Sequence, residues 1–164
     1  MSASSPFAHP AFAPYADLIG ALDLERGPPA HAALDALARD AHLVNAQGRP
    51  LRFVAPDGRL AARDYERAIF DSGAVPTRTD NWHDTLNALV WLRFPRLKAA
   101  LNAAHVAAMA DETGPVRQRR RDALTLLDES GVLVTSRTPE LVERLRAHAW
   151  ETVFVERRAA AIAD

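Results

Sequence analysis

The stretch from residue 81 to residue 112, NWHDTLNALVWLRFPRLKAALNAAHVAAMADE, decides the fold of this chain. Its apolar residues recur at the three- and four-residue spacing of an α-helix, and it begins with Asn81, a residue type that caps helix starts. Pro95 interrupts the pattern, because proline cannot donate a backbone hydrogen bond and crowds the residue before it. We therefore predict a helix over 81–112 that kinks or breaks at Pro95. The face expected to meet the core comprises Trp82, Leu86, Leu89, Val90, Leu97 and Leu101.

A set of polar side chains lies beside this apolar face and not opposite it. On a helical wheel the set falls within about 100° of His83. Groups of this kind can exchange protons, bind a metal ion or form hydrogen bonds, and their position at the edge of the core favours a site over a solvated surface. The members are Asp80, Asp84, Asn87, Lys98, Asn102 and His105.

The rest of the chain gives shorter signals. The segment YERAIF, residues 65–70, fits both the helical and the strand period, and we favour a strand because Ser72-Gly73 follows closely. Thr138-Pro139 has the pattern of a capped helix start. The predicted order is an extended arm over 1–14, helices over 16–24 and 29–42, strands over 51–54 and 65–70, the long helix, a hairpin of strands over 121–127 and 132–135, and a last helix after Thr138. We expect an α+β fold in which residues 15–164 form a single domain, with a small, mostly antiparallel sheet covered by the Pro-interrupted helix and further helices.

Composition excludes several classes of protein. Hydrophobic residues make up 48% of the chain and charged residues 25%, which is typical of a soluble globular protein. The net charge of −1 gives no bulk attraction to nucleic acid or to a membrane surface. The basic run of Arg117, Arg119, Arg120 and Arg121, which we interpret as a solvated loop, has no aromatic residues between its members. The absence of cysteine excludes disulfides and thiolate metal sites. The N-terminus has neither the basic nor the apolar region of a secretion signal, so we expect a cytoplasmic protein with no membrane partner.

Three functions remain open for the polar set. In the first, His83, Asp84 and His105 form a hydrolase-like catalytic site and are the candidate ligands of a divalent metal ion. In the second, the chain is a binding module without chemistry that holds an anionic small molecule or a partner's acidic segment. Its ligand-binding residues are Arg78, Asn81, Asn87, Lys98 and Asn102. In the third, the set is a capped helix start with a purely structural role. The sequence identifies no cofactor and no oligomeric state.

Several strings in the middle of the chain resemble DUF3025, a bacterial family of uncharacterised proteins. They are Val75-Pro76-Thr77-Arg78, Asn81-Trp82-His83-Asp84, Asn87-Ala88-Leu89-Val90-Trp91 and Phe94-Pro95-Arg96, with Tyr65-Glu66 before them and Arg121-Asp122-Ala123-Leu124-Thr125 and Asp128-Glu129 after them. The resemblance covers roughly residues 51–158 and implies no reaction. It implies that Arg78, Asn81, His83, Asp84, Asn87, Lys98 and Asn102 belong to the family's signature. It also implies a further C-terminal segment with a glycine and a histidine, which this chain lacks because it ends at Asp164.

Overall fold

The computed structural model describes residues 5–110 and 115–164. It divides into two compact units, one ending at Asp128 and one beginning at Glu129, and each is described by itself. The single domain expected from the sequence therefore stays a prediction. Residues 1–4 of the expected arm and residues 111–112 at the end of the expected long helix lie outside the described residues. None of the described helices is both long enough and apolar enough to cross a membrane.

The N-terminal arm is wound into short helical turns and is not extended. The 3-10 turns η1 (Pro6–Ala8) and η2 (Pro10–Tyr15) each start on a proline, whose fixed φ suits a first helical position. Two aromatic side chains of this arm pack on the core: the Phe7 ring lies 5.2 Å from Phe12 and 5.8 Å from Trp82, between centroids. The following elements are α1 (Ala16–Ala21), η3 (Leu24–Arg26) and α2 (His31–Asp40), close to the predicted helices.

The sheet is a parallel pair, so the prediction of a mostly antiparallel sheet was wrong. Strand β1 (Arg52–Val54) pairs with β2 (Ala74–Pro76), and Phe53 lies opposite Val75. Residues 65–70, expected as a strand, belong to the helix α3 (Ala62–Ser72), which forms the crossover between the two strands. A helical crossover returns the chain in the same direction, which makes the pairing parallel.

The end of α3 explains why the strand prediction failed. Gly73 follows the last helical residue with a φ of 75°, the left-handed conformation of a helix C-terminus, and its N–H donates to the carbonyl of Ile69. A Cβ at Gly73 would also collide with the carbonyl oxygen of Pro50. The glycine interpreted as the end of a strand is therefore a helix stop at a position with no room for a side chain.

The long helix breaks at the proline. Helix α4 (Trp82–Arg93) ends at Phe94 and α5 (Pro95–Ala110) starts directly after it. The break changes which side of each half is buried. Leu89 and Leu101 lie in the interior as expected, but Trp82 and Leu86 are exposed. Of the two alternatives predicted at Pro95, a kink or a break, the structure has the break, and the predicted apolar face is only partly buried.

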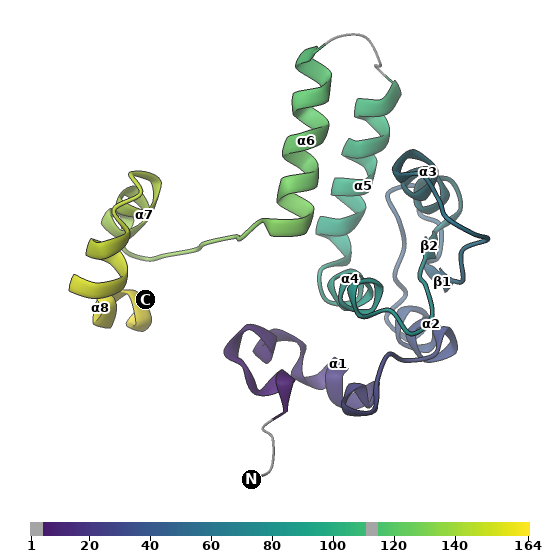
Figure 1. Cartoon of the computed structure of the whole chain (residues 1–164), viewed down its shortest axis with the longest axis horizontal. Helices are drawn as coiled ribbons and strands as arrows, with labels where there is room; N and C mark the ends of the chain where they lie inside the picture. The colour runs from purple at the N-terminus through teal and green to yellow at the C-terminus, as the bar shows by residue number, and fades with distance from the viewer. Residues whose placement is uncertain (1–4, 111–114) are drawn as a thin grey trace. The chain divides into compact units, whose positions relative to one another are not determined.

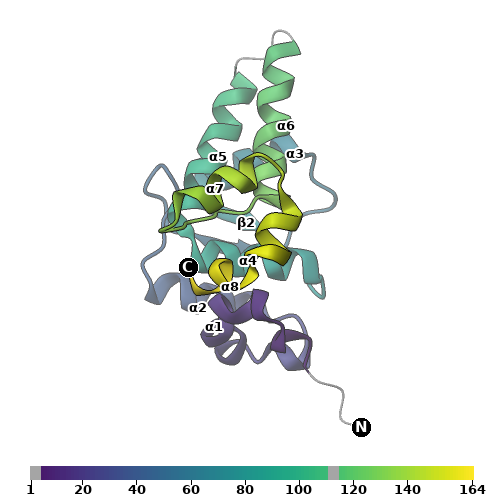
Figure 2. The same cartoon turned by 90° about the vertical axis from the view of Figure 1, so that its left-hand side faces the viewer.

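Residues 121–135 do not form the expected hairpin. Residues 121–130 belong to the helix α6 (Pro115–Ser130), and residues 131–135 have no regular structure. The basic run Arg119 to Arg121 is thus helical and not part of a loop. In both views α6 runs beside α5, and α3 lies on the other side of α5 in Figure 1 (Figures 1 and 2).

The second unit is small. It contains α7 (Pro139–Arg146), which starts after Thr138 as predicted, a π-helical segment η4 (Thr152–Glu156) and α8 (Arg158–Ala163). Its buried apolar residues are Leu141 and Val153. The Asp164 side chain closes the unit, because its carboxylate accepts the backbone N–H of Arg137 at 3.1 Å.

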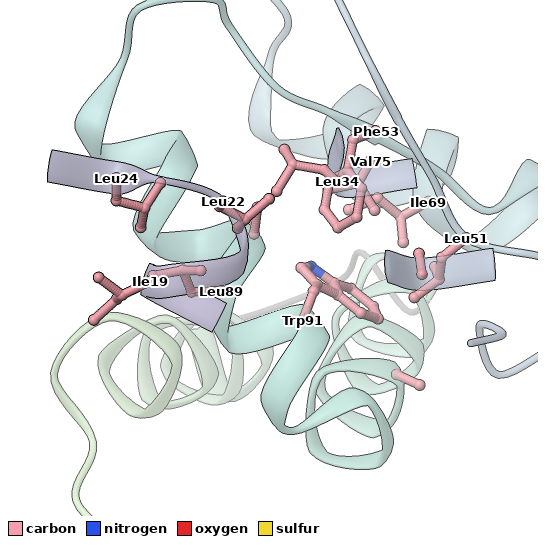
Figure 3. Close-up of a cluster of buried hydrophobic side chains, with 13 residues drawn as sticks. Ile19, Leu22, Leu24, Leu34, Leu51, Phe53, Ile69, Val75, Leu89 and Trp91 are labelled. Atoms are coloured by element: carbon pink, nitrogen blue, oxygen red, sulfur yellow. The ribbon is translucent and has the colours of Figure 1, made fainter. Parts of the chain in front are cut away.

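The core of the first unit joins α1, α2, both strands and α4 (Figure 3). Trp91, Phe53, Leu34 and Val75 are each at most 1% exposed, and burying side chains of this size contributes about 1.5–3 kcal/mol each. Polar anchors fix α2 to the same core: the Asp35 carboxylate accepts the backbone N–H of Phe53 at 2.6 Å. The core side of α5 therefore lies against a rigid apolar layer.

Candidate functional site

Three polar side chains of α5 point into the protein interior. Lys98, Asn102 and His105 are spaced four and three residues apart, which puts them on one face of the helix. Only 3–6% of each residue's surface is exposed. Since lysine is rarely buried without a partner, this face must meet polar groups on neighbouring helices.

Those groups come from α3 and α6. The Asn102 amide donates to the Glu66 carboxylate at 2.7 Å and to the Glu66 main-chain carbonyl at 2.9 Å. The Lys98 ammonium donates to the Asp128 carboxylate at 2.5 Å and lies 5.7 Å from the centroid of the Trp91 ring. The Asn87 amide on α4 donates a hydrogen bond to the Tyr65 hydroxyl on α3 at 2.8 Å. We call this group the polar cluster; its members are Tyr65, Glu66, Asn87, Lys98, Asn102, His105 and Asp128.

The polar cluster surrounds a small cavity. The cavity volume is about 10 Å³, room for about one water molecule. Asn102 lines it, and the Asn102 Oδ1 atom is buried without a hydrogen-bond partner. Leaving a buried acceptor unpaired would cost about 1–3 kcal/mol, so this oxygen is available to a water molecule or a ligand in the cavity. The lining residues are Tyr65, Glu66, Ile69, Trp91, Lys98, Leu101, Asn102, His105 and Asp128.

Burial controls the charge state of the polar cluster. It raises the pKa of the Glu66 carboxyl above its ordinary value, although the Asn102 hydrogen bond and the nearby His105 and Lys98 oppose the shift. Burial and the neighbouring Glu66 charge raise the pKa of the Tyr65 hydroxyl, which keeps its proton. A half-buried carboxyl that holds its proton more firmly than usual is typical of acid–base sites.

A second group of polar residues lies at the start of α4, and we call it the α4 clasp. Asn81 caps the helix by accepting the Asp84 backbone N–H at 3.0 Å. The Asp84 carboxylate accepts the backbone N–H and two guanidinium hydrogen bonds of Arg78, at 2.8–2.9 Å. The His83 ring lies 3.1 Å from the same carboxylate. The hydrogen bonds from Arg78 hold the pKa of Asp84 well below its usual range. The clasp therefore fixes the loop after β2 to the first turn of α4.

The predicted site residues are divided between these two groups. Asn87, Lys98, Asn102 and His105 lie in the polar cluster, whereas Arg78, Asn81, His83 and Asp84 form the α4 clasp. The His83 side chain is 77% exposed, and its ring nitrogen contacts the Asp84 carboxylate. Within residues 5–110 and 115–164, no three histidine or acidic side chains come close enough to hold a metal ion, so His83, Asp84 and His105 do not converge on one ion.

The model of one protein family matches the chain over residues 51–164, and the family is described as a protein of unknown function, DUF3025. The chain belongs to DUF3025. No curated protein and no solved structure gives a significant match to it. The resemblance inferred from the central strings is thus confirmed. Both the polar cluster and the α4 clasp lie inside the matched residues, and membership in DUF3025 assigns no reaction to either.

The sequence analysis missed three members of the polar cluster as site residues. Tyr65, Glu66 and Asp128 stand in strings that resemble DUF3025, so the signal was present. The reason they were missed is that we predicted a strand over 65–70, and a hairpin with strands over 121–127 and 132–135 whose connection contains Asp128. Only as helices do α3 and α6 bring Glu66 and Asp128 to the polar face of α5.

Proposed function

We propose that the polar cluster binds a small polar molecule and that Glu66 exchanges a proton with it. The observation that carries this proposal is the unpaired Oδ1 of Asn102 in a cavity lined by Lys98, His105 and Glu66. Lys98, Asn102 and His105 come from α5 and Glu66 comes from α3, and each carries a group that can donate, accept or transfer a proton. The proposed chemistry is acid–base.

The energetics of the cluster support a chemical role over a purely structural one. Removing a lysine and a carboxylate from water costs several kcal/mol per ion, and an apolar pair of similar volume often joins helices as well or better. The Lys98 side chain is 7% exposed and that of Asp128 is 24% exposed, so much of this cost applies here. The polar cluster is a costly way to join α5 to α6.

The hydrogen-bonding inventory defines the ligand. The Tyr65 hydroxyl accepts from Asn87, which leaves its own proton free to donate. Asn102 Oδ1 offers a free acceptor, and His105 offers a second titratable group beside Glu66. A ligand with both a donor and an acceptor, such as an amide or a hydroxyl compound, satisfies this set.

The α4 clasp has a structural role in this proposal. An anion at Arg78 would have to displace the Asp84 carboxylate, which already accepts both guanidinium hydrogen bonds. The His83 side chain is exposed and contacts Asp84, so it belongs to the α4 clasp. Of the residues predicted from the sequence, the proposal keeps His105 for proton transfer and Asn87, Lys98 and Asn102 for binding.

NMR spectroscopy of the ¹⁵N-labelled chain tests the proposal with acetamide and imidazole as probes. Trp91 lines the cavity, whereas Trp82 and Trp150 are exposed elsewhere, so its indole N–H signal reports on the site. We expect both probes to shift the Trp91 signal, and Glu66→Gln to weaken the binding of imidazole, the more basic probe, by several-fold. Asp64→Asn, an exposed carboxyl on the same helix, is the matched control and leaves binding unchanged. If neither probe moves the Trp91 signal, the proposal is wrong.

A further inference from the structure

Helix α6 closes the cavity through one carboxylate. The Asp128 carboxylate of α6 forms an ion pair with Lys98 of α5. Leu126 and Leu127, in the last turns of the same helix, are 66% and 42% exposed. The cavity holds about one water molecule, so a larger ligand enters only when a wall moves. Among residues 119–130 of α6, no side chain is buried, so few apolar contacts hold this helix against the cavity. Displacing Asp128 breaks its ion pair with α5.

Lys98 requires an anion whether the wall is closed or open. The Lys98 side chain is buried, and its ammonium lies over the Trp91 ring. A buried ammonium without a counter-charge is strongly unfavourable. When Asp128 leaves, the nearby Glu66 carboxylate is still engaged by the Asn102 amide, so the place that Asp128 held on Lys98 is open to the anion of a ligand. The structure itself shows which anion this place accepts, because a carboxylate already occupies it.

We propose that the ligand is a small carboxylate with a hydroxyl group on the neighbouring carbon, and that Asp128 occupies the place of the ligand's carboxylate on Lys98. This inference rests on the proposed function and specifies its ligand. The ligand's carboxylate replaces that of Asp128 on the ammonium, and its hydroxyl donates to the unpaired Oδ1 of Asn102. Lys98 and Asn102 are one helical turn apart, about 5–6 Å between side-chain origins, which suits a molecule of two or three carbons.

The charges around the cavity favour a monoanion. Glu66 lies beside Lys98 and Asn102, and a doubly charged phosphate would be repelled by it whenever it is ionised. Phosphate is also bound best by the planar fork of arginine or by several backbone N–H groups, and the cavity lining offers a single lysine. A carboxylate with one negative charge exchanges with Asp128 without changing the net charge of the site.

The chain offers an unusually direct readout, because Lys98 is its only lysine. Growth with ¹³Cε-lysine places a single side-chain signal in the site, and no assignment is needed. The probes are acetate, acetamide and glycolate at neutral pH: acetamide has the shape of acetate without its charge, and glycolate adds the hydroxyl. They are titrated into the full chain, into Asp128→Asn and into Asp122→Asn, an exposed carboxylate on the same helix that serves as the matched control.

We expect acetate to shift the Lys98 signal and to bind Asp128→Asn about tenfold more tightly than the unmodified chain, because the internal competitor has lost its charge. Asp122→Asn behaves as the unmodified chain does. Glycolate binds several-fold more tightly than acetate in every protein. If Asp128→Asn does not fold, the unmodified chain gives the result: acetate speeds amide hydrogen exchange in α6, whereas acetamide does not.

The outcomes separate this inference from the proposed function. If acetamide shifts the Trp91 signal but acetate leaves Lys98 unchanged, or if acetate binds the two variants equally, the carboxylate inference is overturned and the proposed function stands. If acetate binds but glycolate binds no better, the assignment of the hydroxyl to Asn102 is overturned. If no probe shifts either signal, both the inference and the proposed function fail.

Discussion

The polar cluster and the α4 clasp contain similar residue types but differ in burial and in how completely they are paired. In the clasp, the exposed Arg78 guanidinium forms paired hydrogen bonds with Asp84, whose side chain is 12% exposed, and the His83 side chain is 77% exposed. In the cluster, Asn102 is buried and one of its polar atoms has no partner. The difference shows that a hydrogen-bond acceptor available to a ligand, the Oδ1 of Asn102, lies in the interior of the protein and not in the clasp.

The break at Pro95 produces this difference. Before the break, the polar residues at the start of α4 face solvent, and after it Lys98, Asn102 and His105 face inward. A continuous helix would have kept His83 and His105 on one side, although about 33 Å apart along its axis. The proline thus separates a structural group from a candidate chemical group within one stretch of sequence.

The largest expected effect is on the buried ion pair. Lys98→Ala removes the partner of Asp128 and leaves a cavity beside Trp91, so the free energy of unfolding should fall by about 3–5 kcal/mol. Denaturant unfolding with circular dichroism measures it. The double variant Lys98→Met with Asp128→Leu should recover most of that loss, because an apolar pair needs no counter-charge. A double variant no more stable than Lys98→Ala would show that the charges themselves hold α6 in place.

The two groups should respond to pH in opposite directions. Burial raises the pKa of Glu66, so the folded state keeps this proton longer than the unfolded state, and stability falls as pH rises above the ordinary value of 4.5. Hydrogen bonds from Arg78 lower the pKa of Asp84, so its contribution is lost as pH falls below 3.8. Each slope is at most about 1.4 kcal/mol per pH unit.

Thermal unfolding across pH, compared between the unmodified chain and single variants, isolates each carboxyl. Glu66→Gln should remove the loss of stability above pH 4.5 and leave the acid side unchanged. Asp84→Asn should remove the loss below pH 3.8 and leave the neutral side unchanged. Equal pH profiles for Glu66→Gln and the unmodified chain would mean that Glu66 titrates normally, and the comparison of the two groups would lose its electrostatic basis.

A smaller effect is expected at Arg78. Its side chain is 59% exposed, and exposed ion pairs contribute at most about 1 kcal/mol. Arg78→Ala should therefore lower the free energy of unfolding only slightly, much less than Lys98→Ala does, and 1 M salt should reduce the difference. Binding of acetamide at the polar cluster should not change. A variant that loses that binding would place Arg78 in the site.

The smallest effect is expected at His83. With its side chain 77% exposed, His83→Ala should change the free energy of unfolding by less than about 0.5 kcal/mol. Chemical denaturation at pH 7 and pH 5.5 measures this. A loss of several kcal/mol would show that the imidazole supports the clasp much more strongly than its contact with Asp84 indicates.

The elements with strong periodicity could be predicted from the sequence. The prediction was wrong where a glycine could end either a strand or a helix. The helices around Leu89 and Leu101, strand β1 and the start after Thr138 were predicted correctly. Gly73 and Gly131 were both interpreted as turns after strands, although each follows the last residue of a helix. A short amphipathic segment before a glycine fits either structure, and only tertiary packing decides between them.

The candidate site was half predictable for the same reason. Lys98, Asn102 and His105 were identified because they share a face of one helix, which is a local property. Their partners Glu66 and Asp128 lie on helices far along the chain, and no local pattern gives that pairing. The exposure of His83 was also unpredictable, because it depends on where Pro95 turns the chain.

The core described above also determines how the chain can be shortened. The family match begins at Leu51, but Ile19, Leu24 and Leu34 from the preceding segment pack into the same interior as Phe53. A fragment trimmed to the match would leave the inner surfaces of β1 and α4 uncovered and would aggregate. Expression of the polar cluster for ligand screening should therefore begin upstream of α1.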